Sequence, residues 1–521
     1  MSEKPNFLYI MCDQLRADWL GCYGHKVVKT PNIDALAATG TRFDKFYVAS
    51  PICMPNRASF MTGRFPSVNG LRWNGCSLPQ RANTFVDVLR KAGYNTASIG
   101  KSHLQPFTEV EAEKRGLDGD NMPIQEAWEP DNGRYDLEQP SQYRGSDRFE
   151  FPLPYYGFNH VDMVTGHGDR AGGHYLQWFR DQHENWEQLR SPQSQLPHSY
   201  TCPQGYRTAI PEDSYPTAYI RNSAKKFLSE QSGAERPFFA YVSFADPHHP
   251  FNPPGKYWDM YDPDDFDLTL RFDDHKNPPP PLVHAHATFI AGGGQKTPQT
   301  AFMANERQQK EIMALTAGML TMIDDAVGEL VQTLKDTGQY DNTVIVFNSD
   351  HGDYMGDFDM MLKGAWPLES INRVPMIWSD PLDRVERTTT ALTSTIDISA
   401  SVIDRAGLQP YFGIQGESFL ECVQGNQHHR DDIFIEYNDP LSRMGFSEPA
   451  RVRTVLTDKW RLTTYKDQEW GELYDRQSDP QETQNLWDDP SHAPAKAEMF
   501  ERLAANLIAQ MDESPRSALL A

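Results

Sequence analysis

The sequence predicts an α/β fold built on a large, mainly parallel β-sheet with helices on both faces. Short apolar runs alternate with helical patterns over about the first 385 residues, as parallel strands joined by crossover helices require. Polar side chains follow these runs, where ligands of such sheets gather. The chain of 521 residues is too long for one ordinary hydrophobic core, so a second, smaller unit is also expected.

Three continuous apolar runs are expected to form buried strands, namely Asn6–Cys12, Phe238–Phe244 and Thr343–Phe347. Asn95–Gly100 is predicted as a further strand. Because each run is short and lies between helical patterns, we expect the strands to pair in parallel.

Helices are expected between the strands. The segment between Asn305 and Asp336 carries apolar residues at steps of three and four, and Pro31–Gly40 and Thr84–Gly93 both end at a glycine stop. Residues 105 to about 215 and 259–300 are rich in Pro and Gly and only weakly periodic. We predict the first as an insertion of loops over the sheet edge and the second as another long loop.

The sequence pattern changes near residue 385. We therefore divide the chain into a large domain of residues 1–385, which includes both insertions, and a C-terminal subdomain of residues 386–521. Ser394–Ala406 predicts a helix. Three later runs predict a small antiparallel sheet: Val452–Leu456, Trp460–Tyr465 and Glu472–Asp475. A terminal helix is predicted over Ala495–Met511, directly after a proline that a first turn tolerates.

The composition disfavours several partners. With 49 basic and 72 acidic residues the net charge is −23, which argues against nucleic acid, anionic membranes and long polyanionic substrates. A small anion could still enter a locally basic pocket. The six cysteines form no CxxC pairs, so neither a zinc ribbon nor a disulfide scaffold is indicated. We see no signal peptide and no apolar run of about 20 residues, and expect a cytoplasmic enzyme.

The segment Cys53-Met-Pro-Asn-Arg57 is the most informative motif. Taken alone, such a cysteine is usually a small buried hydrophobe. Asp13 follows the first strand, and Asp350 and His351 follow the strand Thr343–Phe347. A lone aspartate there is commonly a turn or capping residue, but two carboxylates and an imidazole together suit a divalent cation.

Read as Cys-x-Pro-x-Arg followed by Ala-Ser and Thr-Gly-Arg, this motif resembles the signature of the formylglycine-dependent sulfatases of the alkaline phosphatase superfamily. Other blocks resemble that family in the same order: Asn6–Asp18, Thr30–Asp34, Ile99–Leu104, Asp246–Pro250, Met355–Lys363 and Asp479–Leu486. The blocks run from about residue 5 to residue 487, and chance agreement of so many is implausible. The chain is identified as a member of this family, which implies an alkaline phosphatase-like catalytic domain.

The resemblance implies a hydrolase of aryl or alkyl sulfate monoesters. Its nucleophile would be formylglycine, an aldehyde that a maturation enzyme makes from Cys53 and that hydrates to a diol. One divalent metal ion would be bound by Asp13, the modified Cys53, Asp350 and His351. Arg57 would hold the diol, and four residues would surround the sulfate and the leaving oxygen: Lys101, His103, His248 and Lys363. His249 competes with His248 for its place.

Two positions depart from the common family pattern. Cys12-Asp13 stands where many sulfatases carry two aspartates, and Asp350-His351 stands where many carry Asp-Asn. Because calcium prefers oxygen ligands and manganese accepts imidazole, the metal stays open between Mn²⁺ and Ca²⁺. Both departures resemble the branch of choline sulfatases and phosphonate monoester hydrolases, which also implies that Asn74 contacts the substrate.

Lys101 and His103 favour sulfate esters, because phosphonate monoester hydrolases typically carry Tyr and Thr at these places. Hydrolysis of phosphonate monoesters or phosphodiesters is the alternative, and one enzyme could act on both. A catalytically silent binding protein and an enzyme with a Cys53 thiolate nucleophile are further alternatives. The aromatic residues of the first insertion could line an aryl or sugar site, or pack a lid or a subunit interface. A homo-oligomer is expected.

Overall fold

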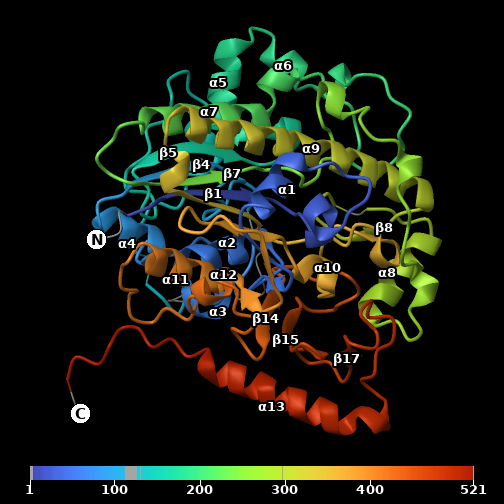
Figure 1. The fold of residues 1–521 in the computed structure, drawn as a ribbon. Helices are drawn as coiled ribbons and strands as arrows, with labels where there is room; N and C mark the ends of the chain where they lie inside the picture. The colour runs from blue at the N-terminus through green and yellow to red at the C-terminus, as the bar shows by residue number, and fades with distance from the viewer. Residues whose placement is uncertain (1–3, 112–125, 130, 296, 520–521) are drawn as a thin grey trace.

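The computed structural model describes residues 4–111, 126–129, 131–295 and 297–519. Its centre is a nine-stranded sheet with the strand order β12-β2-β11-β9-β1-β7-β4-β5-β6 (Figure 1). The parallel centre consists of β9 (Thr343–Ser349), β1 (Asn6–Cys12), β7 (Phe238–Ser243), β4 (Asn95–Gly100) and β5 (His160–Thr165). On one side follow β11 (Met376–Ser379), β2 (Thr41–Phe43) and β12 (Arg387–Thr389), and β6 (Gly172–Gly173) forms the other edge. The predicted mainly parallel sheet is confirmed, with β11 and β6 antiparallel to their neighbours β9 and β5.

The register brings the carboxyl ends of the central strands level with one another. Met11 of β1 pairs with Ser243 of β7 and with Asn348 of β9. Ser243 also pairs with Gly100 of β4. The residues that follow these strands therefore meet at one edge of the sheet, although they lie far apart in the sequence.

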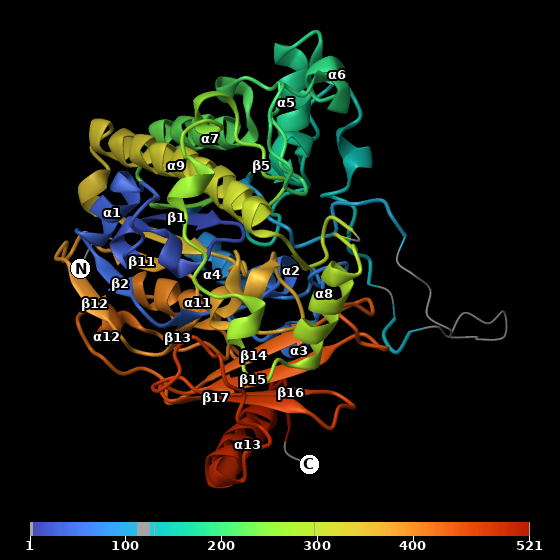
Figure 2. The same cartoon turned by 90° about the vertical axis from the view of Figure 1, so that its right-hand side faces the viewer.

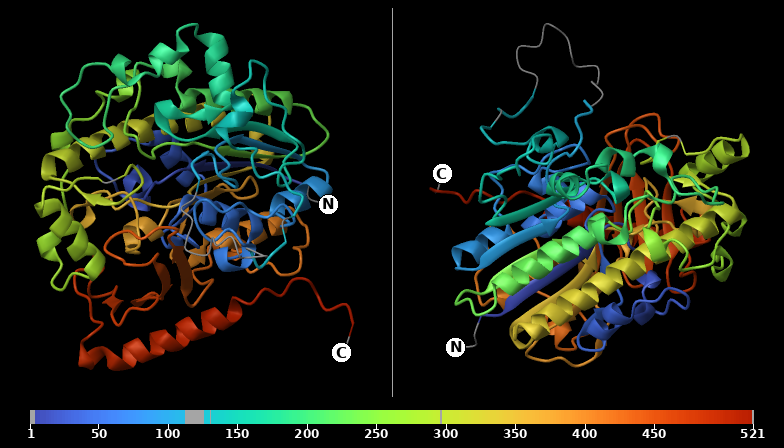
Figure 3. Two further views of the ribbon diagram at one scale, coloured as in Figure 1. Left: turned by 180° about the vertical axis from the view of Figure 1, so that it is seen from behind. Right: turned by 90° about the horizontal axis from the view of Figure 1, so that it is seen from above.

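Helices cover both faces of the sheet. On one face α7 (Pro216–Glu230) and α9 (Glu306–Asp336) lie side by side (Figure 3). On the other face lie α2 (Cys53–Thr62), α4 (Phe85–Lys91) and α11 (Thr395–Arg405). Successive residues of β1 point to opposite faces, so Leu8 and Ile10 enter one hydrophobic core while Phe7 and Tyr9 enter the other. This double burial explains why β1 is apolar throughout.

The first insertion is more than a set of loops. Besides β5 and β6 it contains α5 (His174–Gln182) and α6 (Trp186–Leu189), which stand at one end of the molecule (Figure 2). The prediction of loops alone is wrong here. The strand β5 was not recognised because it carries polar residues among its apolar ones and, in the part of the chain that the structure describes, pairs on its outer side with the two-residue β6. The second insertion likewise contains α8 (Pro280–Ile290), whose first turn accommodates the proline run.

The C-terminal part contains the predicted antiparallel sheet. Its strands, in order, are β14 (Ile433–Asn438), β15 (Arg451–Leu456), β16 (Trp460–Tyr465) and β17 (Gly471–Asp475). The terminal helix α13 (Ala493–Ala509) packs on β15 and β16 (Figure 1). The division at residue 385 stays a prediction; β12 and α11, which follow it, pack with the large sheet and with α2.

The remaining short elements connect this framework. They are α1 (Pro31–Ala37), β3 (Phe46–Tyr47), α3 (Pro66–Asn69), β8 (Phe302–Met303), β10 (Met360–Met361), α10 (Glu369–Asn372), β13 (Thr393–Ser394) and α12 (Leu420–Val423). Within the described ranges, no helix combines the length and the apolar character needed to cross a lipid bilayer.

Candidate active site

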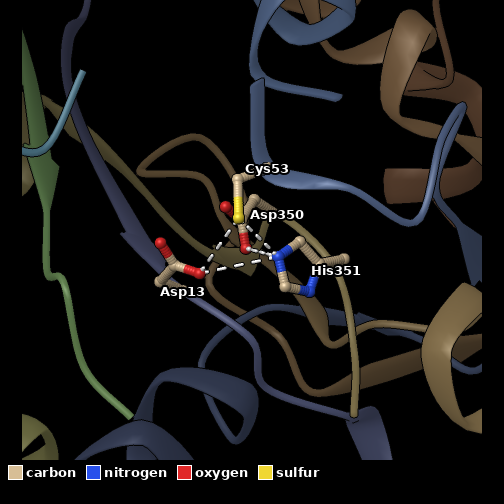
Figure 4. A group of neighbouring side chains, drawn as sticks. All are labelled: Asp13, Cys53, Asp350 and His351. Carbon is tan, nitrogen blue, oxygen red and sulfur yellow. Dashed lines mark hydrogen bonds and ion pairs between the residues drawn. The ribbon is translucent and has the colours of Figure 1, made fainter. Parts of the chain in front are cut away.

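Cys53 and three residues from strand ends form one buried cluster (Figure 4). Cys53 is the first residue of α2, Asp13 follows β1, and Asp350 and His351 follow β9. The Sγ atom of Cys53 lies 3.0 Å from Nε2 of His351 and 3.7 Å from Oδ1 of Asp13. Nε2 of His351 lies 3.5 Å from Oδ1 of Asp13 and 3.6 Å from Oδ1 of Asp350. These four residues are the metal ligands that the resemblance to the sulfatases implies.

The chemistry of this cluster fits one divalent cation. His351 Nδ1 lies 2.9 Å from the Gly352 carbonyl oxygen, which can only accept, so Nδ1 carries the proton and the lone pair of Nε2 faces the cluster. Burial lowers the pKa of His351 to about 4, which keeps the imidazole neutral, the form that binds metals. Oxygen ligands of one cation at about 2.3–2.6 Å lie roughly 3.3–3.7 Å apart when adjacent. The spacing of the two carboxylates from His351 falls in this range.

Arg57 holds the two carboxylates in place from the side away from the cluster. Its Nε donates to Oδ2 of Asp350 at 2.8 Å, and its Nη2 donates to Oδ2 of Asp13 at 3.4 Å. Its Nη1 donates to the Lys101 carbonyl oxygen and to the hydroxyl oxygens of Tyr241 and Ser243, all at 2.8–2.9 Å. Because the other oxygen of each carboxylate takes these bonds, Oδ1 of each stays turned toward His351.

Two lysines bring positive charge to the cluster. Lys101 follows β4, and its Nζ donates to Oδ2 of Asp13. Although burial acts in the opposite direction, the Lys101 ammonium holds the pKa of Asp13 well below its usual range. Lys363 donates to Oε1 of Gln14 at 2.5 Å. Both lysines are almost fully buried, so neither charge is dispersed in solvent.

Three further histidines at the site, His103, His248 and His249, each have a ring nitrogen without a partner among the described residues; in His249 it is Nε2, while Nδ1 lies 3.4 Å from Nε2 of Gln14. His248 follows β7 and donates from Nδ1 to the His249 carbonyl oxygen at 2.6 Å, so Nε2 is left free. His103 follows β4 and leaves Nδ1 free. Burial lowers the pKa of His103 and His248 well below the usual value, helped by Lys101 beside His103 and by the neighbouring imidazoles beside His248. Both rings are therefore neutral, and in His248 the free Nε2 is the acceptor.

The structure adds three residues that the sequence analysis missed. The backbone N–H of Gln14 donates to Oδ1 of Asp350 at 3.1 Å. Glu138 accepts the backbone N–H groups of the turn 103–105 at 2.9–3.1 Å, which supports the left-handed backbone of His103 (φ +56°). His167 lies 2.6 Å from Lys101. His167 follows β5, so the rule that ligands follow parallel strands would have found it, had that strand been recognised.

Asn74 lies beside the cluster. Its Oδ1 accepts the backbone N–H of Met54 at 3.2 Å, at the second residue of α2. It thus contacts the residue next to Cys53. Its contact with a substrate stays a prediction.

Comparison with known proteins adds independent information. The family profile described as Sulfatase matches residues 5–408, and one described as N-sulphoglucosamine sulphohydrolase, C-terminal, matches residues 358–509. An arylsulfatase of Clostridium perfringens is 28% identical over 498 residues, which cover 93% of this chain and 90% of the relative. A choline-sulfatase of Rhizobium meliloti is 27% identical over 498 residues, with coverages of 94% and 83%. The crystal structure of a phosphonate monoester hydrolase of Agrobacterium radiobacter aligns with a TM-score of 0.76 at 24% identity. The alignment covers 99% of this chain and 98% of that one, and it shows that the two share a fold.

Proposed function

This chain belongs to the sulfatase family, and from that premise we propose that it hydrolyses aryl or alkyl sulfate monoesters to sulfate and a phenol or alcohol. Four cationic or imidazole side chains around the cluster carry this proposal: Lys101, His103 and His248 near Asp13, and Lys363 near Cys53 and His351. They offer positive charge and free ring nitrogens where a sulfuryl group must be held while a proton moves. Such fixed charges and dipoles stabilise the charge that develops in group transfer.

The nucleophile is proposed to be formylglycine made from Cys53. The hydrated aldehyde would supply one hydroxyl as the nucleophile toward sulfur and a second hydroxyl whose deprotonation would let sulfate leave without attack of water on sulfur. The unmodified thiol is a poor nucleophile here, because burial and Asp13 raise its pKa to about 11. Cys53 is only 2% exposed, so a maturation enzyme would have to reach it before the chain has folded.

The metal is proposed to be held by Asp13, residue 53, Asp350 and His351. A bound divalent cation would supply positive charge beside the nucleophilic oxygen of residue 53. The imidazole of His351 among the ligands supports Mn²⁺ more than Ca²⁺. Arg57 orients Asp13 and Asp350 through its hydrogen bonds to both.

The hydrogen bonds support a division of work among the remaining groups. Lys363 is the proposed proton donor to the leaving oxygen, because its ammonium carries N–H groups beyond the one given to Gln14. His248 has its only proton on Nδ1, directed at a carbonyl, and so offers an acceptor rather than a donor. His103 is neutral with an unpartnered Nδ1, and with its ring proton on Nε2 it would accept a proton at Nδ1 when sulfate is expelled.

A second candidate function is hydrolysis of phosphonate monoesters or phosphodiesters at the same site. His351 among the four cluster residues favours it, since the sequence resemblance associated this histidine with the phosphonate monoester hydrolase branch. Lys101 and His103 favour sulfate esters instead. One cation and one set of donors could serve both tetrahedral centres.

Rates on matched substrates test the proposal. The enzyme is first matured, and mass spectrometry confirms the aldehyde at residue 53. kcat/KM is then compared for an aryl sulfate and the aryl phosphonate monoester with the same leaving group. A higher value for the sulfate is expected, whereas a clear preference for the phosphonate would overturn it in favour of the second candidate. Cys53→Ser is the matched control, which should fold but lose multiple turnover; full turnover by this variant would exclude the aldehyde mechanism.

We also propose that the protein forms a homo-oligomer. The exposed side of α13 carries large apolar residues, among them Leu507 and Ile508, the latter 78% exposed, and the exposed Met511 lies two residues beyond the end of the helix. Exposed apolar stripes of this kind are typical of interaction surfaces. Light scattering after size-exclusion chromatography measures the mass; a monomer of 59.4 kDa at micromolar concentration would refute the proposal.

A further inference from the structure

His167 lies at the site but has no role in the scheme above. Its Nε2 is 2.6 Å from Nζ of Lys101 and 3.7 Å from Oδ2 of Asp13. A lysine ammonium has three donors and no acceptor, so Nε2 of His167 must accept this hydrogen bond. The ring is therefore unprotonated at Nε2, with its lone pair directed at Lys101.

The local backbone holds this imidazole in place. His167 stands between Gly166 (φ +70°) and Gly168 (φ +53°), two left-handed positions that suit glycine. A Cβ atom at Gly168 would lie 2.6 Å from Oδ1 of Asn252 and 2.8 Å from Cγ of Pro250. Only glycine lets the turn after β5 approach the loop after β7 so closely.

Aromatic contacts fix the plane of the ring. His167 stacks on His248 with a centroid distance of 3.6 Å and an angle of 9°, and Phe107 meets it edge-on at 5.7 Å and 78°. The ring can thus neither rotate nor shift without disturbing these neighbours. Its acceptor is preorganised for Lys101, which raises the value of the hydrogen bond in a buried site.

Asp13, His167 and His248 could also be taken for the ligands of a second cation. However, the Lys101 ammonium contacts Asp13 and His167, two of the three. This place therefore holds positive charge that belongs to the chain itself. One N–H of the ammonium goes to Asp13 and one to His167, which leaves one N–H for the substrate.

We propose that His167 is a positioning residue for sulfate ester hydrolysis: together with Asp13 it fixes the Lys101 ammonium so that the third N–H points at the sulfuryl group. The role rests on the proposed function. Without His167 the ammonium could turn, and its third N–H would no longer be directed at the oxygen that gains charge.

Two substitutions of similar size separate acceptor from bulk. His167→Gln keeps an acceptor near the position of Nε2, and His167→Met removes it. We expect His167→Met to lower kcat/KM by about 10- to 100-fold, as is usual for residues that orient an active group, and His167→Gln to restore most of it. His183→Met is the matched control: His183 is another histidine of the first insertion, it contacts Ser214, and its loss should leave kcat/KM unchanged.

A double-mutant cycle shows whether His167 acts through Lys101. In a Lys101→Met background, adding His167→Met should cause no further loss of kcat/KM. Equal losses for the Gln and Met variants, an additive cycle, or wild-type activity of His167→Met would each overturn the proposal. Thermal unfolding of each variant identifies any that has merely lost its fold. If His167→Met is such a variant, the kcat/KM of His167→Gln tests the proposal instead.

Calorimetric titration with inorganic sulfate provides a readout apart from turnover. His167→Met should weaken the sulfate affinity about 5- to 10-fold, or by about 1 kcal/mol, and His167→Gln should not. If the matured wild-type enzyme turns over neither sulfate nor phosphonate esters, the proposed function fails. The pattern of sulfate affinities would still support or overturn the role of His167 in holding Lys101.

Discussion

Replacing Arg57 by leucine should reveal how much this side chain stabilises the two buried carboxylates of Asp13 and Asp350. All three guanidinium nitrogens donate, and the two acidic partners, Asp13 and Asp350, are fully buried. Removing one partner of a buried ion pair costs about 3–5 kcal/mol, because the other charge is left without compensation. Leucine has similar bulk, so little of this loss should come from a cavity. We therefore expect Arg57→Leu to lose about 3–5 kcal/mol in the free energy of unfolding in the presence of a chelator.

Urea unfolding followed by tryptophan fluorescence measures this loss, with refolding checked for reversibility. A bound divalent cation would compensate the same carboxylates, so the loss should be smaller in metal-loaded protein. Arg90→Leu is the control, since Arg90 forms only a partly exposed pair with Asp87 and should change stability by less than about 0.5 kcal/mol. A loss below about 1 kcal/mol for Arg57→Leu in chelator would refute the reasoning.

Three further predictions concern other parts of the site. Glu138→Gln should lower kcat/KM by about 10-fold or more, because an amide cannot accept all three N–H groups of the turn that carries His103; a steady-state assay with unchanged KM and kcat would contradict this. Burial raises the pKa of Asp246 to about 7, so between about pH 4 and pH 7 the unfolded chain has released a proton that the folded chain keeps, and wild-type stability falls as pH rises. Between pH 4 and pH 8, the free energy of unfolding of Asp246→Asn should rise by up to about 4 kcal/mol relative to that of the wild type. Equal urea midpoints for the two proteins at both pH values would refute this. Chelation should destabilise the wild type by about 3 kcal/mol when the metal is 100-fold above its Kd, and His351→Leu should abolish that difference; a variant whose stability still responds to chelator would remove His351 from the metal.

Much of the site could be predicted from the sequence because its residues follow recognisable strands. Asp13 and Asp350 come directly after apolar runs, and Cys53 and Arg57 lie in one compact motif at the start of α2. Such local patterns depend on residues that are adjacent in the sequence, so they can be recognised without knowledge of the fold. The strand β5 was missed because it carries polar residues and so lacks the continuous apolar run of β1 or β9, and His167 was missed with it.

The sequence by itself determined the fold class, the order along the chain of four of the five central parallel strands, and the identity of the four cluster residues. Only the tertiary structure decided which oxygen of Asp13 and Asp350 faces His351, because Arg57 takes the other one of each. It also decided that His167 lies against Lys101, across 66 positions of sequence. These contacts depend on strand register and on the burial of charges from distant segments, and neither quantity is encoded in any local pattern of residues.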